Sequence, residues 1–132
     1  MHRLIHWSPF LTLLTVAILL MGASCGTTPG VTLVATGETI KAVGTDWLAV
    51  NAKFVEGCKP SGPTLDAGTC ASARAFGEKF KKAYPLASDL YATAVGTNDA
   101  ALAGDAKAAV RKLALEGAAL AIKVGLTMRE VK

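Results

Sequence analysis

After residue 31, hydrophobic positions recur every three or four residues, which is the spacing of one face of an α-helix. The first such run fills the a and d positions of a heptad repeat, with Thr36 at one of them. Its apolar members are Leu33, Ile40, Val43, Trp47, Val50 and Phe54. This pattern predicts a helix from about Thr32 to Glu56, ended by Gly57 and then by Pro60.

A second run of the same periodicity comprises Ala73, Phe76, Phe80, Ala83, Ala87, Leu90 and Ala94. We expect Thr69 to cap its start with a side-chain oxygen, and Gly96 to end it. Pro85 lies inside this run and lacks the amide that would donate to the Lys81 carbonyl. We therefore expect a kink there, or two shorter helices that meet at Tyr84.

The third run extends from about Asp99 to Arg129, and the tight connector before it, residues 97–99, also carries a capping signal. The positions predicted to point inward are Leu102, Ala106, Ala109, Leu113, Gly117, Leu120 and Val124. The stretch from Ala100 to Ala121 is rich in alanine, which favours helix and lets neighbouring backbones approach closely.

Three long helices joined by short connections predict an all-α fold, an antiparallel three-helix bundle over residues 32–132. A break at Pro85 would make it a bundle of four helices. No cluster of β-branched residues is bounded by turns, so no sheet is expected. The large side chains expected in the core are Trp47, Phe54, Phe76, Phe80 and Leu113.

The N-terminal segment has a different pattern. Residues 1–7 contain one Arg and no acid, and an apolar stretch from Phe10 to Met21 follows, with small residues after it. These three features describe a cleavable secretory signal peptide, here residues 1–24. An apolar helix of this length would span about 18 Å, which is too short for a bilayer core of about 30 Å.

The end of this segment, Met21-Gly22-Ala23-Ser24-Cys25, resembles the lipobox of bacterial lipoproteins. In that family, signal peptidase II cleaves before the cysteine, which then receives lipid. The resemblance implies a lipid anchor on Cys25, a tether over residues 25–31 and a membrane as one partner. Gly26 stands where an Asp would resemble an inner-membrane retention signal, so by analogy we expect an outer-membrane lipoprotein that faces the periplasm. The alternative is ordinary cleavage between Ala23 and Gly26, which leaves no lipid anchor.

Two further cysteines, Cys58 and Cys70, flank a turn-rich connector. An exported chain enters an oxidising compartment, so we expect these two thiols to form a disulfide. A redox or metal-binding role fits less well, because the spacing is not CxxC and no histidine is nearby.

Composition then limits the chemistry. Both histidines, His2 and His6, lie in the signal segment, so the mature chain lacks the base of Ser-His and Cys-His pairs and the usual zinc and haem ligands. The carboxylates are spread singly, and none is paired with another acid at helical spacing. We therefore expect no enzyme activity, no metal and no cofactor. The net charge of +4 falls to +3 without Arg3, which on an exported bundle gives no electrostatic basis for binding nucleic acid.

The remaining candidates for recognition lie in the second run. Lys79, Lys81 and Lys82 surround Phe80 and could contact anionic headgroups, or they could form a solvated helix face. Tyr84 and Tyr91 are seven residues apart and share a face, which suits a partner surface or packing between helices equally well.

Together these features predict a small membrane-anchored envelope lipoprotein, a non-catalytic binding or scaffolding module with an envelope protein as partner. The alternative is a carrier that holds a small apolar ligand within the helical bundle.

Overall fold

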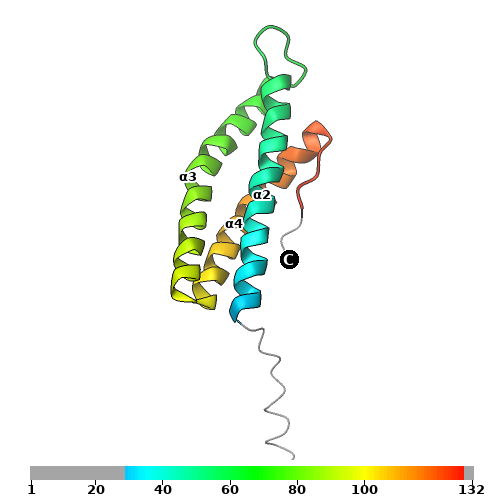
Figure 1. The fold of residues 1–132 in the computed structure, drawn as a ribbon. Helices are drawn as coiled ribbons and strands as arrows, with labels where there is room; N and C mark the ends of the chain where they lie inside the picture. The colour runs from blue at the N-terminus through cyan, green and yellow to red at the C-terminus, as the bar shows by residue number, and fades with distance from the viewer. Residues whose placement is uncertain (1–28, 130–132) are drawn as a thin grey trace, which may run out of the picture.

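A computed structural model describes residues 29–129 of the chain. Three helices make up most of it: α2 (Pro29–Gly57), α3 (Ala67–Thr97) and α4 (Ala100–Ala121), followed by a 3-10 turn, η1 (Ile122–Val124). Successive helices run in opposite directions and lie side by side (Figure 1). The predicted all-α, antiparallel three-helix bundle is confirmed, and residues 29–129 contain no strand.

The four-helix alternative is wrong, because α3 continues unbroken through Pro85. An interior proline costs a helix about 3 kcal/mol through the lost hydrogen bond and the clash of its ring. Contacts on both sides of Pro85 offset this cost: Phe80 and Ala87 are buried in the core, and the Tyr84 hydroxyl bonds to α2. In Figure 1, α3 follows a curved course along the other two helices.

The cap of α3 also differs from the prediction. Asp66, in an extended conformation with ψ 155°, is the N-cap, and its carboxylate accepts the Thr69 amide at 2.8 Å. The Thr69 hydroxyl donates to the same carboxylate at 2.6 Å, so Thr69 is a partner of the cap inside the first turn.

The predicted connector between α3 and α4 is confirmed, but it begins at Asn98 and not at residue 97. The helix passes Gly96 and ends at Thr97, and Asn98 takes the left-handed conformation with φ 54°. Asn and Gly are the residues that tolerate this cap conformation best. Asp99 then caps α4 by accepting the amides of Ala101 and Leu102 at 2.9 and 3.0 Å.

The third helix is shorter than predicted and its buried stripe is shifted. It ends at Ala121, because the chain turns at Gly125, whose φ is 71°. Ala109 is exposed, whereas the buried positions are Ala103, Ala106, Val110, Leu113, Ala114, Gly117 and Ala121. After the turn, residues 125–129 run back across the bundle and bury Met128.

The core contains the five large side chains expected in it, all of them buried. Trp47 lies at its centre, with the Phe76 ring edge-on at 4.6 Å and the Phe80 ring at 5.5 Å between centroids. Thr36 is also buried at the heptad position where it interrupts the apolar residues.

Candidate functional site

The three seams between the helices differ in how they are closed. α3 and α4 have the most extensive contact, and both helices bury alanines. The seam between α2 and α4 is crossed by the C-terminal strap, residues 125–129, in which Met128 packs near Gly117 and Arg129 bonds to Asp46. The seam between α2 and α3 has no such cover among residues 29–129, and open hollows line it.

Two tyrosines of α3 pack into glycine positions of α2 along this seam. The Tyr84 hydroxyl donates to the Ile40 carbonyl at 2.9 Å, and its ring lies over Gly44. The Tyr91 hydroxyl donates to the Leu33 carbonyl at 2.9 Å, and its ring lies over Gly37. A Cβ atom added to either glycine would lie 2.3 Å from the hydroxyl oxygen, so only glycine leaves room for the ring.

The same register continues to the other end of the seam. One heptad beyond the Gly44 layer, Asn51 and Gly77 line a common hollow, and one heptad further Cys58 is bonded to Cys70 with 5.8 Å between their Cα atoms. The predicted disulfide is therefore confirmed. Each step of seven residues forward on α2 matches a step of seven back on α3, which makes four layers in one antiparallel register.

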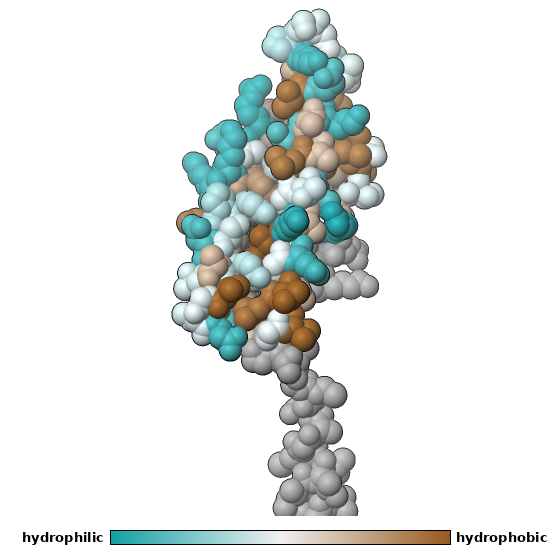
Figure 2. Space-filling model, viewed as in Figure 1, coloured by the Kyte–Doolittle hydropathy of each residue, from teal (hydrophilic) through white to brown (hydrophobic). Residues whose placement is uncertain are grey.

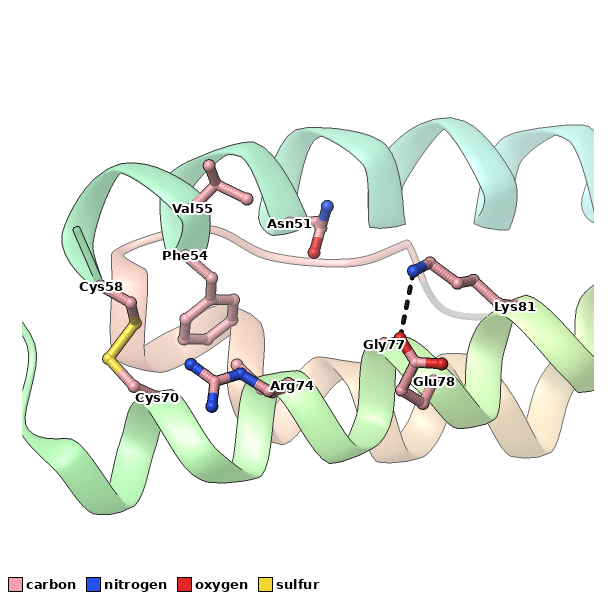
Figure 3. A pocket seen from close by; sticks show the side chains of 10 residues that line it. Asn51, Phe54, Val55, Cys58, Cys70, Arg74, Gly77, Glu78 and Lys81 are labelled. Atoms are coloured by element: carbon pink, nitrogen blue, oxygen red, sulfur yellow. Dashed lines mark hydrogen bonds and ion pairs between the residues drawn. A yellow bond between two sulfur atoms is a disulfide. The ribbon is translucent and has the colours of Figure 1, made fainter. Parts of the chain in front are cut away.

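Two adjoining hollows lie above these layers, and we call them together the α2–α3 groove. The hollow nearer the start of α2 has a volume of about 440 Å³ and a mainly apolar lining that includes Ile40, Leu48, Phe80 and the two tyrosines. The hollow nearer the disulfide has a volume of about 320 Å³ and is lined by Phe54, Val55 and Arg74 among others (Figure 3). Both are open troughs on the surface.

The edges of the groove carry exposed residues. On the α2 edge, the side chains of Leu48 and Val55 are 70% and 62% exposed, and Lys41 lies one heptad before Leu48. On the α3 edge lie Arg74 and Lys81, again seven residues apart. Brown apolar and teal polar side chains alternate over the face that α2 and α3 form (Figure 2).

The five residues predicted as a partner surface do not form one patch. Lys79 pairs with Glu116 of α4, whereas Lys81 lies on the opposite side of α3 and pairs with Glu78 at 3.1 Å. Lys82 is exposed. Tyr84 and Tyr91 are half-buried in the seam, where packing and hydrogen bonds to α2 account for both. Lys81 and the tyrosines are therefore the members that reach the α2–α3 groove.

Sequence reasoning missed the α2 side of this groove. Gly37, Gly44, Leu48 and Val55 were not singled out, although stepping back by sevens from the cysteine pair places Gly44 opposite Tyr84 and Gly37 opposite Tyr91. Cys25 and residues 1–24, which the sequence predicts to be a signal peptide, lie outside the described residues.

Four groups within residues 29–129 have a shifted pKa, and one of them is Arg129, whose pKa is raised by its side-chain hydrogen bonds to Asp46. Burial in the seam, where the Tyr84 hydroxyl donates to the Ile40 carbonyl, raises the pKa of Tyr84. Hydrogen bonds from the Arg129 side chain lower the pKa of Asp46, and hydrogen bonds from Thr69 lower that of Asp66. Asp46 and Arg129 thus belong to the contact that holds the strap, Asp66 to the α3 cap and Tyr84 to the seam.

Within residues 29–129, no three or more His, Cys, Asp or Glu side chains gather in a way that could hold a metal ion. None of the helices in this range is both long and apolar enough to cross a membrane. Comparison with protein-family models, with curated proteins and with solved structures found no match.

Proposed function

We propose that the protein is a small envelope lipoprotein, tethered to a membrane by lipid on Cys25, that acts as a non-catalytic binding module. The α2–α3 groove is the observation that carries this proposal. It is open, its hollow nearer the start of α2 has a mainly apolar lining, and the neighbouring seam between α2 and α4 is covered by the chain's own strap. Exposed apolar residues that are rimmed by polar ones are typical of interaction sites.

The position of α2 supports the tether. Cys25 precedes the first helical residue, Pro29, by four residues, which span at most about 14 Å. Exposed valines gather near this end of the bundle, with Val31 and Val34 in the first turns of α2 and Val95 near the end of α3. An apolar patch next to the anchor suits a domain held close to a membrane surface.

The anchor is tested by metabolic labelling with an alkyne fatty acid. We expect the full chain to incorporate the label and to fractionate with membranes, and Cys25→Ser to lose both properties. A matched control replaces Cys58 and Cys70 with Ser and should still be labelled, because neither would carry lipid. Membrane fractionation without label in the unaltered chain would contradict the lipid anchor.

The binding surface is tested with a photo-crosslinking residue at Leu48, in cells that natively express the protein. Leu115 of α4 is 66% exposed, lies away from the groove and serves as the matched position. We expect a discrete adduct from position 48 and none of the same mass from position 115. Adducts of equal yield at both positions would mean that the groove is not a preferred surface.

A second candidate function is a carrier of a small apolar ligand. The larger hollow supports it, since a volume of about 440 Å³ with a mainly apolar lining is within the range of small-molecule sites. The buried centre, in contrast, is filled by Trp47 and the phenylalanines around it. Native mass spectrometry of the purified lipoprotein distinguishes the two functions, because a carrier should retain a bound small molecule.

A further inference from the structure

We propose that the α2–α3 groove binds an acidic amphipathic helix of a partner protein, which would lie along α2 and α3 as a fourth helix. This inference rests on the proposed binding function and names the kind of partner.

The periodicity of the groove favours a helical occupant. Its α2 edge repeats every seven residues at Lys41, Leu48 and Val55, and its α3 edge repeats at Arg74 and Lys81. Side chains at heptad spacing on two neighbouring helices form the holes into which a third helix inserts its own a and d side chains.

The floor of the groove argues against an extended peptide. A β-strand binds where a sheet edge offers free backbone amides and carbonyls, and α2 and α3 use theirs within each helix. The hydroxyls of Tyr84 and Tyr91 already donate to α2 carbonyls. The floor therefore offers mainly apolar contact.

The length of the groove also fits a helix. Its four layers extend from Gly37 to Cys58 on α2, which at 1.5 Å per residue is about 30 Å. A partner helix of about three heptads would cover both hollows, whereas a single small ligand would occupy one of them.

The charged side chains on the edges of the groove favour a partner helix of negative charge. Lys41, Arg74 and Lys81 are the cations that line the groove, and Glu78 is the one acid in its lining. Glu78 already pairs with Lys81, and Lys41 and Arg74 have no ion pair within residues 29–129. Carboxylates along both sides of an apolar stripe would complement these positions.

The test uses two synthetic three-heptad peptides, each with Leu at a and d, one with Glu and the other with Lys at e and g. Binding to the mature lipoprotein is measured by fluorescence anisotropy of the labelled peptide, and the contact surface by amide chemical shifts. We expect the Glu peptide to bind at least about tenfold more tightly than the Lys peptide. The shifted amides should cluster on α2 around Leu48 and on α3 around Lys81.

Variants test the two edges. Leu48→Asp should weaken binding of the Glu peptide by about tenfold or more, whereas the matched Leu115→Asp should not. Lys41→Glu should weaken it and reduce its salt dependence, with Lys112→Glu on α4 as the charge control. All four substituted positions are exposed on the surface of α2 or α4, so the folded state should survive these changes.

Other outcomes overturn the proposal. Equal binding of both peptides would contradict the preference for an acidic helix. Amide shifts on the outer face of α4 would show that the peptide does not bind in the groove. Tight binding of palmitate or of phosphatidylglycerol vesicles at Leu48, without binding of the Glu peptide, would make the occupant a lipid. Self-association that Leu48→Asp abolishes would make it a second copy of this chain. The last two results would still leave the groove a binding surface, so they overturn this inference without overturning the proposed function.

Discussion

Single side chains set the separation of α2 and α3, because tyrosine faces glycine in two successive layers of their seam. Each tyrosine ring occupies the space that a larger residue on α2 would fill, and its hydroxyl bonds to a carbonyl one turn away. Shape and hydrogen bonding thus agree on the same register.

Gly44→Ala should lower the free energy of unfolding by about 1–2 kcal/mol. The new methyl group would overlap the Tyr84 hydroxyl, and overpacking of about 1–3 kcal/mol exceeds the gain of up to about 1 kcal/mol from the better helix propensity of alanine. Gly104→Ala is the matched control, because nothing lies within 4 Å of its added Cβ atom, and it should stabilise the protein. Urea denaturation measures both changes, and a stabilising Gly44→Ala would refute the close packing.

These layers show what the sequence could and could not predict about the site. Heptad spacing placed Trp47 and Phe76 in the core, because burial follows from periodicity alone. Periodicity assigned the tyrosines equally to packing and to a partner surface, because a position at the border of a stripe can face either way. The deciding fact is the glycine that lies opposite, and pairing the two helices required the register that the disulfide defines.

The ends of the helices depend on capping residues in the sequence and on tertiary contacts, to different extents in α2 and α4. The end of α2 at Gly57 was predictable, because a glycine followed shortly by a proline commonly ends a helix. The structure adds that the Gly57 carbonyl accepts the amides of Thr64 and Leu65 in the loop that follows. The end of α4 was not predictable, because Gly104, Gly117 and Gly125 look alike in the sequence. Only the docking of Met128 and Arg129 on the bundle selects Gly125 as the turn.

Pro85→Ala should stabilise α3 by about 1–3 kcal/mol. The change restores an amide donor for the Lys81 carbonyl and removes the ring clash, and Pro85 is exposed, so no core contact is lost. Pro63→Ala in the exposed loop is the control and should be neutral or slightly destabilising, because it only frees the unfolded chain. Thermal unfolding followed by circular dichroism measures both, and a loss of stability in Pro85→Ala would show that the curvature of α3 depends on the proline.

Reduction of the Cys58–Cys70 disulfide should lower the free energy of unfolding by roughly 2–4 kcal/mol, because it frees a closed loop of the unfolded chain. The helical content should remain, since the cores of the helices do not depend on the loop. Thiol titration of the native protein should find neither Cys58 nor Cys70 free. Two free thiols would contradict the oxidised state, and loss of the helical signal on reduction would mean that the bond is required for folding.

At the scale of the whole molecule, the ion pair between Arg129 and Asp46 holds the C-terminal strap over the seam between α2 and α4. Arg129 donates to Asp46 through its backbone amide at 3.0 Å and through its guanidinium at 2.9 Å, and the Asp46 side chain is only 14% exposed. This contact fixes the strap across α2 and α4, so that α2 and α3 remain the pair with an open groove between them.

The strap should make stability depend on pH. The pKa of Asp46 is lowered in the folded protein from 3.8, so its contribution is complete above that value and is lost as the pH falls through the lower, folded pKa. Asp46→Asn should therefore destabilise the protein at pH 7, and its difference from the unaltered chain should shrink below about pH 4. Denaturant titrations at pH 7, 5, 4 and 3 measure this, with the exposed Asp89→Asn as a control. A difference that stays constant down to pH 3 would contradict the role of the Asp46 charge.

The four layers of the α2–α3 seam also restrict how the length of this protein can vary. A residue inserted between Gly44 and Cys58 would shift the tyrosine layers out of register with the disulfide layer, unless α3 gained a residue at the matching place. Even with both insertions, every side chain beyond the inserted residue would rotate by 100° around its helix. Only whole heptads, added or removed in all three helices together, preserve both. The length of the loop between Cys58 and Cys70 should thus vary freely among homologues. The helices themselves should be longer or shorter by whole heptads, which are steps of about 10 Å.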